Sequence, residues 1–227
     1  MSADRRHFLI SKALSKLLRH QAVNEKLPID EKGFVPLEQI LNHRYIRSLK
    51  ATFEDIFFVV NQNDKKRFRI VSQEGEQFVD ALEYKPNRSY YICALQGHSL
   101  SSVSQSFDMV ELTAETFPEV IVHGTYRRYW KDIKQTGGLS RMKRNHVHFA
   151  KGLPRWFSNN SDNTVISGMR KSCDLLIYLD VDKIKNSPLT FYESGNGVIL
   201  TPGDENGIVG LQYFKEVTDV EGNRVYN

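Results

Sequence analysis

Histidine and arginine recur in short polar segments of the 227-residue sequence. The segments are LSKLLRH (14–20), NDKKRFRI (63–70), QGHS (96–99), HGT (123–125), RNHVHFA (144–150) and SGMR (167–170). Five of the seven histidines lie inside them: His20, His98, His123, His146 and His148. An even scatter would not group histidines in this way, so the pattern favours a site that is assembled from several segments.

Arginine and histidine together suit phosphate chemistry. The guanidinium group offers a planar fork of donors to phosphate oxygens and stays charged at any relevant pH. Histidine can donate or accept a proton near neutrality. Arg19 and His20 at the end of a helix, together with Arg67 and Arg144, could therefore surround a phosphate dianion. Taken singly, each arginine also fits a solvated surface position.

A zinc site is a competing interpretation of the histidines. His146 and His148 are two residues apart, which places both imidazoles on one face of a strand. His123 could supply a third ligand. However, no carboxylate or cysteine stands at a recognisable ligand spacing. We therefore expect no metal.

The composition sets broad limits on the class of protein. Hydrophobic residues make up 40% of the chain, enough for one large domain or two small ones. A net charge of +4 is compatible with a phosphate-rich partner without requiring one. Two cysteines give no disulfide framework, and no signal peptide or membrane-spanning stretch is present. We expect an intracellular monomer, in the nucleus, the cytoplasm or both.

Helices are predicted to position the first segments. Residues 4–21 have helical spacing, with Asp4 as the N-cap and an apolar face formed by Ile10, Leu14, Leu17 and Leu18. A second helix is predicted over 36–41, with proline in its first turn. A third begins at Thr52, which can form a capping box with Asp55.

Strands follow these helices. Alternation predicts one strand around 67–70 and another over 90–94, so the chain up to about Gln96 reads as a winged-helix-like unit. The serine-rich segment 99–108 is the predicted linker. Beyond it, a strand over 119–122 enters HGT, a helix covers 130–135 before two glycines, and further strands are predicted in HVHFA, DLLIYLD, GVILT and LQYF.

The order of the motifs points to a known family. LSKLLRH, NDKKRF, QGHS, HGT, RNHVH, SGMR and FYESGNGVILT occur in the order seen in RNA 2′-phosphotransferases, which this chain resembles from about Leu14 to Phe214. The resemblance is greatest to eukaryotic, fungal-like tRNA 2′-phosphotransferases. It implies an α+β fold, with a winged-helix lobe for the RNA phosphate over 1–105. A mostly β lobe with the ADP-ribosyltransferase fold would bind NAD⁺ over 106–227.

The resemblance also implies a reaction and its residues. In this family the internal 2′-phosphate of a spliced tRNA attacks the nicotinamide ribose of NAD⁺, the co-substrate, and nicotinamide leaves. The ribose 2″-hydroxyl then attacks the phosphate, which releases RNA with a free 2′-OH and ADP-ribose 1″,2″-cyclic phosphate. The catalytic residues implied are Arg19, His20, Arg67 and Arg144. Those implied for NAD⁺ are His123, Gly124, Thr125, His148, Ser167, Gly168 and Arg170.

Two departures from the family pattern are visible. Ala150 stands where the family often has serine, so a hydroxyl is missing. The chain is also longer than usual between Arg67 and Gln96, where we expect an extended hairpin or loop. Deleting residues 76–86 is accordingly expected to leave activity largely intact.

Three other functions compete with this interpretation. A phosphoesterase with two H-x-T/S motifs matches His123-Gly-Thr125, but a second such motif is absent. A nucleic-acid-binding regulator would use the winged helix and its basic residues only to position phosphates. A protein ADP-ribosyltransferase would share the C-terminal lobe but would have no use for the phosphate-binding arginines.

Overall fold

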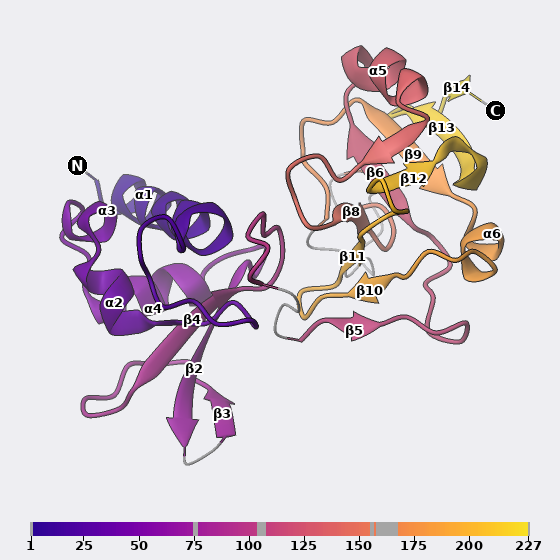
Figure 1. Ribbon diagram of the computed structural model, residues 1–227. Helices are drawn as coiled ribbons and strands as arrows, with labels where there is room; N and C mark the ends of the chain where they lie inside the picture. The colour runs from indigo at the N-terminus through magenta and orange to yellow at the C-terminus, as the bar shows by residue number, and fades with distance from the viewer. Residues whose placement is uncertain (1, 75–76, 104–107, 155–156, 158–167, 227) are drawn as a thin grey trace. The chain divides into compact units, whose positions relative to one another are not determined.

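The computed structural model describes residues 2–74, 77–103, 108–154, 157 and 168–226. The chain divides into two compact units, Met1–Asp108 and Met109–Asn227, called here the N lobe and the C lobe (Figure 1). The predicted α+β class is confirmed, because helices and sheets both occur and strands predominate in the C lobe. None of the described helices has the length and apolar character needed to cross a membrane.

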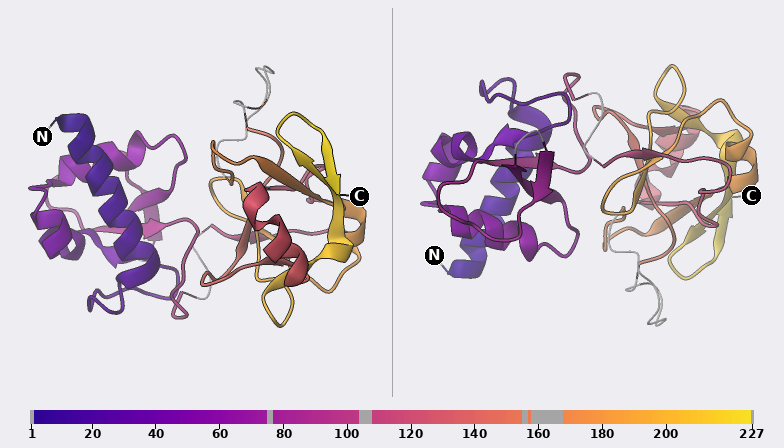
Figure 2. Two further views of the ribbon diagram at one scale, coloured as in Figure 1. Left: turned by 90° about the horizontal axis from the view of Figure 1, so that it is seen from above. Right: turned by 90° about the horizontal axis from the view of Figure 1, so that it is seen from below.

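The N lobe begins with a long helix that ends in a π-helical turn. Helix α1 spans Ala3–Lys16 and is the indigo helix in Figure 2; η1, a π-helix, continues it over Leu17–Gln21. The predicted N-cap was wrong by two residues: Ser2 is the cap, and its hydroxyl accepts a hydrogen bond from the amide of Arg5. The predicted apolar face is confirmed, since its four members are fully buried: Ile10, Leu14, Leu17 and Leu18.

Three shorter helices complete the helical layer of this lobe. Helix α2 spans Leu37–Asn42, α3 spans Arg44–Arg47 and α4 spans Phe53–Asn61. The predicted capping box of α4 is confirmed, with the Thr52 hydroxyl and the Asp55 carboxylate each accepting from the backbone amide of the other residue. Helix α3 was not predicted, because four residues are too few to show a period.

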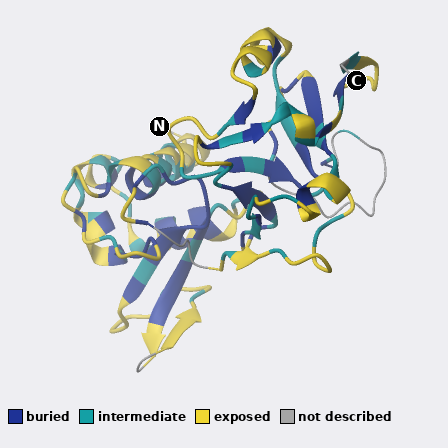
Figure 3. Cartoon of the chain, turned by 45° about the vertical axis from the view of Figure 1, so that its right-hand side comes forward, coloured by how far each residue is buried: buried dark blue, intermediate teal, exposed yellow. Residues whose placement is uncertain are grey.

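A four-stranded antiparallel sheet carries these helices on one face. Its order is β1 (Val35–Pro36), β4 (Tyr90–Ala94), β2 (Phe68–Glu74) and β3 (Gln77–Asp80). The predicted strands at 67–70 and 90–94 are thus present, and they pair with Ile70 opposite Ile92. The hairpin of β2 and β3 occupies the longer stretch after Arg67, and all four residues of β3 are exposed (Figure 3).

The predicted linker needs a correction. Residues 104–107 of this segment lie outside the described part of the chain. Leu100 and Val103, however, are buried in the core of the N lobe. Serine content suggested a solvated connection, but these two apolar side chains tie the start of the segment to the lobe.

An eight-stranded sheet forms the centre of the C lobe. Its order is β14 (Arg224–Tyr226), β13 (Phe214–Asp219), β9 (Leu175–Leu179), β6 (Val122–Thr125), β8 (Val147–Ala150), β11 (Val198–Thr201), β10 (Tyr192–Glu193) and β5 (Val110–Glu111). A separate pair joins β7 (Gly138–Ser140) to β12 (Ile208–Gly210). Strand β6, which contains HGT, therefore lies in the interior of the large sheet.

Short helices flank these strands. They are η2 (Arg127–Tyr129), α5 (Trp130–Gln135), α6 (Val181–Lys185) and η3 (Leu211–Tyr213). The predicted helix over 130–135 is confirmed, and Gly137 follows it with a left-handed φ of 79°. Two strand predictions were wrong. The strand predicted over 119–122 begins only at Val122. The first three residues of LQYF form the 3₁₀ turn η3, and its phenylalanine, Phe214, begins β13.

Candidate functional site

In the N lobe, the π-helical turn presents Arg19 and His20. A π turn inserts one extra residue per hydrogen-bonded ring and is frequent at functional sites. The Arg19 guanidinium carbon lies 5.9 Å from the centre of the Phe68 ring at the start of β2. His20 Nδ1 lies 2.9 Å from the Ser99 hydroxyl, and the Ser99 amide donates to the Arg19 carbonyl at 2.9 Å. The segment after β4 therefore holds this turn in place.

The glycine of QGHS explains how that segment can pass so near. Gly97 has a left-handed φ of 87°, and a Cβ there would lie 3.4 Å from Arg19 Nε. A larger residue would be strained and would press on the guanidinium group. His98 has a different role, because only 3% of it is exposed and its ring stands beside Gly33. It is a packing residue of the core.

A tight turn before β2 positions Arg67. Lys66 has a left-handed φ of 41°, and Asn63 Oδ1 accepts from the Lys65 amide at 3.1 Å and from Arg67 Nη1 at 3.4 Å. Desolvation by partial burial lowers the pKa of Arg67, and the charge of Asp64 acts in the opposite direction. The Arg67 carbonyl accepts from the amide of Leu95, next to QGHS. The segments that carry Arg19, His20 and Arg67 thus meet in the N lobe.

In the C lobe, His123 is fixed by the neighbouring strand. Its Nδ1 lies 2.7 Å from the backbone carbonyl of His148. A carbonyl only accepts, so Nδ1 carries the proton and the neutral ring keeps a lone pair on Nε2. Desolvation lowers the pKa of His123 below its ordinary value of 6.5, and the charges of Arg170 and Arg144 act in the same direction. The ring is therefore a neutral acceptor at physiological pH, suited to a sugar hydroxyl.

Two glycines allow the segment after 167 to cross the sheet at contact distance. A Cβ on Gly124 would lie 2.4 Å from Met169 Cγ and 2.9 Å from Cys173 Sγ. A Cβ on Gly168, whose φ is 96°, would lie 2.7 Å from the Phe149 carbonyl oxygen. No side chain fits at either position without displacing its neighbours. This close packing places Arg170 beside the HGT strand.

Arg144 occupies a turn of its own, just before β8. Met142 has a left-handed φ of 56°, and Arg141 Nη1 donates to the Arg144 carbonyl at 3.0 Å. Desolvation lowers the pKa of Arg144, and the positive charge of Arg170 lowers it further. Within the described residues, neither Arg144 nor Arg170 forms an ion pair with a carboxylate. Two cations that repel each other, beside a neutral histidine, make a site suited to an anion.

The remaining predicted residues can be placed individually. The Thr125 carbonyl accepts from the Asp174 amide at 3.0 Å, which ties the end of β6 to the crossing segment. His148 is paired with Leu200 of β11, and its carbonyl is the one that holds His123. Ser167 lies outside the described residues. Ala150 is fully buried in an apolar cluster with Val122, Met169, Cys173 and Leu176, where a hydroxyl would need a buried partner.

Sequence reasoning missed the residues that orient the predicted ones. Ser99, Asn63 and Arg141 each make a side-chain hydrogen bond to a predicted site residue or its backbone. Membership in the motifs QGHS and NDKKRF was a signal for the first two. Arg141 lies three residues before RNHVHFA, and nothing in the sequence distinguishes it from a surface arginine. No group of three or more metal-ligating side chains occurs in the part of the chain that the structure describes.

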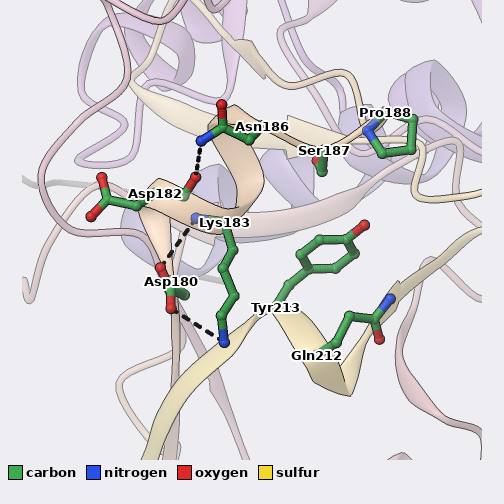
Figure 4. A pocket seen from close by; sticks show the side chains of 8 residues that line it. All are labelled: Asp180, Asp182, Lys183, Asn186, Ser187, Pro188, Gln212 and Tyr213. Atoms are coloured by element: carbon green, nitrogen blue, oxygen red, sulfur yellow. Dashed lines mark hydrogen bonds and ion pairs between the residues drawn. The ribbon is translucent and has the colours of Figure 1, made fainter.

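A hollow of about 730 Å³ elsewhere in the C lobe holds none of the predicted residues (Figure 4). It is lined by Asp180, Asp182, Lys183, Asn186, Ser187, Pro188, Gln212 and Tyr213. Asp180 caps α6 by accepting from the Lys183 amide, and it pairs with the Lys183 ammonium at 3.5 Å. The carboxylate of Asp180 is thus engaged in capping α6 and pairing with Lys183.

Comparisons with known proteins agree with the motif order. A family model described as "RNA 2'-phosphotransferase, Tpt1 / KptA family" matches residues 5–203. A tRNA 2'-phosphotransferase 1 of Danio rerio is 38% identical over 93% of this chain and 85% of its own length. A tRNA 2'-phosphotransferase of Saccharomyces cerevisiae is 37% identical over 88% of this chain and 81% of its own. A probable RNA 2'-phosphotransferase of Rhodopirellula baltica is 30% identical over 88% and 93%.

Proposed function

Because this chain belongs to the RNA 2′-phosphotransferase, Tpt1 / KptA family, we propose that it removes the internal 2′-phosphate of spliced tRNA by transferring it to NAD⁺. The 2′-phosphate displaces nicotinamide from the nicotinamide ribose, and the 2″-hydroxyl of that ribose then takes the phosphoryl group from the RNA. The products are RNA with a free 2′-hydroxyl, nicotinamide and ADP-ribose 1″,2″-cyclic phosphate.

The arginine pair of the C lobe carries this proposal. Arg144 and Arg170 are close enough for their charges to interact, and no described carboxylate pairs with either. An anion placed between them would offset their repulsion. Both reactants are anionic, since one contributes a phosphate dianion and the other a pyrophosphate. The donor set therefore suits the two substrates.

Neighbouring groups of the C lobe suit the sugar of NAD⁺. The neutral His123 would accept a hydrogen bond from a ribose hydroxyl through Nε2. Gly124 and Thr125 supply backbone groups in the same strand, while Gly168 and Arg170 line the segment that crosses it. His148 and Ser167 complete the proposed NAD⁺-binding set. The chemistry assigns no role to a metal.

The N lobe would hold the RNA phosphate. Arg19 and Arg67 offer charged donors from two segments that meet, and with Arg144 they would stabilise the charge that develops on the transferring phosphoryl group. The Ser99 hydroxyl donates to the Arg19 carbonyl at 3.5 Å. It can therefore accept from His20 Nδ1–H, and a ring of that tautomer would act as a base toward the ribose 2″-hydroxyl.

The two lobes have proposed identities as well. Four helices on one face of a small antiparallel sheet with an exposed hairpin support a winged-helix lobe over 1–105. An eight-stranded sheet with HGT in an interior strand supports an ADP-ribosyltransferase-like lobe over 106–227. We further propose that the enzyme is a monomer that works inside the cell, in the nucleus, the cytoplasm or both.

The competing function as a regulator finds less support. Helix α4 is the last helix before the hairpin, the position from which a winged helix usually contacts nucleic acid. Its first turn carries Glu54 and Asp55, and no lysine or arginine lies in Phe53–Asn61. Such a helix would repel a phosphate backbone. The two arginines proposed for the RNA phosphate lie instead at the π turn and before β2.

The direct test uses a short RNA with one internal 2′-phosphate, with and without NAD⁺. Mass spectrometry of the RNA and of the small molecules should show loss of the phosphate together with nicotinamide and ADP-ribose cyclic phosphate, only when NAD⁺ is present. Arg144→Ala should abolish this reaction. Arg224→Ala is the matched control, because Arg224 is an exposed arginine of the same lobe that is already paired with Glu216 at 3.4 Å. Phosphate loss without NAD⁺ would support a phosphoesterase instead.

A further inference from the structure

An exposed cluster of tyrosine and arginine lies beyond the proposed site, at the start of the helix pair η2 and α5. The guanidinium carbon of Arg128 stands 4.9 Å from the centre of the Tyr126 ring and 4.8 Å from that of the Tyr129 ring. The two rings lie nearly at right angles, with centres 6.0 Å apart. Tyr129 is 44% exposed and Arg128 is exposed as well. Arg128 and Tyr129 therefore present an aromatic and cationic surface to solvent.

This cluster is held rigidly by hydrogen bonds beneath it. The Tyr126 hydroxyl lies 2.7 Å from the Ser172 hydroxyl, and the Arg127 amide donates to Asp174 at 2.6 Å. The side chain of Arg127 pairs with Asp219 at 3.0 Å. Arg127 thus forms an ion pair with a carboxylate of its own lobe. Arg128, the next residue, pairs with no carboxylate among the described residues.

The surroundings of the cluster are strongly basic. Residues 127–144 contain seven lysines and arginines but one acidic residue, Asp132. The hydrogen bond to Ser172 and the nearby charge of Arg170 lower the pKa of Tyr126, and the charge of Arg170 also lowers that of Arg144, so the cluster adjoins the proposed site. The charge of Arg170 thus acts on Arg144 of the proposed site and on Tyr126 of the cluster, and Arg128 adds a further cation to the cluster.

We propose that Tyr126, Arg128 and Tyr129 form a second RNA-binding surface, which holds nucleotides of the tRNA that flank the phosphorylated one. This proposal rests on the proposed function. Exposed tyrosines stack on unpaired bases, and guanidinium groups contact both bases and phosphates. Exposed cations next to the proposed site match the charge of a polynucleotide that leaves that site. The surface would therefore add affinity for long RNA without taking part in the chemistry.

The test compares two substrates with one double variant. The substrates are a short RNA of a few nucleotides with an internal 2′-phosphate and a full-length tRNA with the same modification. In the variant Arg128→Ala/Tyr129→Ala, the KM for the tRNA should rise about tenfold, the loss expected for one stacked base and one phosphate contact. The kcat, the KM for NAD⁺ and the kinetics with the short RNA should stay unchanged.

Direct binding gives an independent readout. The affinity of the wild type for tRNA without a 2′-phosphate should fall with salt, and the variant should lose about one unit of the slope of log K against log salt concentration. Tyr129→Phe should keep tRNA affinity, since the ring face remains, and Arg224→Ala should behave like the wild type. If the wild type does not remove the phosphate from the short RNA, the proposed function is wrong. The binding measurement still tests whether this surface binds RNA.

Three results would overturn the proposal. An equal loss on both substrates, with an unchanged melting temperature, would place the cluster in the catalytic machinery. A rise in the KM for NAD⁺ would assign it to the nucleotide co-substrate. Unchanged tRNA affinity and salt slope would leave it no part in RNA binding.

Discussion

Arg67 in the N lobe and Arg144 in the C lobe occupy similar turns in different electrostatic surroundings. Each turn includes a non-glycine residue with left-handed φ, Lys66 or Met142, and leads into a strand of its lobe. Desolvation lowers the pKa of both arginines. The next influence differs, because Asp64 stabilises the charge of Arg67 whereas Arg170 destabilises that of Arg144.

The difference separates two ways of holding a cation for a substrate. The charge of Asp64 partly compensates that of Arg67 within the N lobe, so this cation costs the free protein little stability. Arg144 and Arg170 repel each other, and an anion bound beside both would offset this repulsion. A site of the second kind should bind its substrate more strongly than its geometry alone suggests, because binding removes an unfavourable interaction. It should also reduce the stability of the free protein.

Replacing each arginine by glutamine is the strongest test of this contrast. Both Arg67→Gln and Arg144→Gln should lower kcat/KM for a 2′-phosphorylated RNA by about 10²–10³-fold, the usual effect of removing one charged donor from a transferring group. Their effects on stability should differ. Arg144→Gln should raise the free energy of unfolding by a few tenths of a kcal/mol, since solvent screens these exposed charges, and Arg67→Gln should not.

Denaturant titration of both variants measures the stability difference. Arg170→Gln should reproduce the stabilisation, because it removes the same repulsion from the other side. The double variant Arg144→Gln/Arg170→Gln should then gain less than the sum of the two single gains. If Arg67→Gln stabilises the protein as much as Arg144→Gln does, the contrast between the two turns is wrong.

The histidines extend the comparison, because a side chain orients one and the backbone orients the other. His20 depends on the Ser99 hydroxyl at 2.9 Å, whereas His123 depends on the carbonyl of His148, which no substitution removes. Ser99→Ala should therefore lower kcat about tenfold by freeing the His20 ring. In a His20→Ala background, Ser99→Ala should cause almost no further loss of kcat. If the losses of the two single variants add instead, Ser99 does not act through His20.

The sequence predicted those parts of the fold that local chemistry determines. The α4 capping box needs only Thr52 and Asp55, and the apolar face of α1 needs only its own period. The strand predicted over 119–122 was misplaced because Ile121 and Val122 are both fully buried, so no alternation marks where pairing begins. In LQYF, apolar content suggested a strand, but the residues turn into β13.

The candidate site was predictable in its residues but not in their relations. The motifs identified Arg144 and Arg170 separately, 26 positions apart in the sequence. Their mutual repulsion depends on Gly124 and Gly168, which let the crossing segment contact the sheet. The missing hydroxyl at Ala150 looked like a loss, but its apolar surroundings accommodate the methyl group. Such long-range packing leaves no periodic signal in the chain.

The C lobe should lose stability in mild acid through two of its histidines. Burial lowers the folded-state pKa of His123 and His146 below 6.5. A proton therefore binds the unfolded chain first as the pH falls, so their stabilising contribution is complete above about pH 6.5 and is lost below it. The melting temperature should decrease between pH 7 and 5, before most carboxylates titrate. His146→Asn should lessen the decrease, and an unchanged slope would exclude this residue as a cause.

The smallest effects are expected in residues 77–86 of the N lobe, which comprise β3 and the turn that follows it. Leu82 is 75% exposed and Val79 is 42% exposed. Leu82→Ser and Val79→Thr should change kcat/KM by less than about twofold and stability by less than about 0.5 kcal/mol. The full deletion of 76–86 is a harsher change than the sequence suggested. It removes Tyr84, whose ring stacks on Phe53 with centres 4.6 Å apart.

Tyr84→Ala separates the contribution of residues 77–86 to stability from their contribution to activity. Loss of the stacked pair and of part of its buried surface should cost about 1–2 kcal/mol of unfolding free energy. The kcat/KM at 25 °C should stay within about twofold, because the described ring contacts of Tyr84 are with Phe53, Phe57 and Tyr90, which lie outside the segments that carry the site residues. Urea titration and steady-state kinetics of the same preparation measure both quantities. A large activity loss in folded Tyr84→Ala would mean that residues 77–86 help to shape the N-lobe site. That site would then depend on long-range packing as much as the site of the C lobe does.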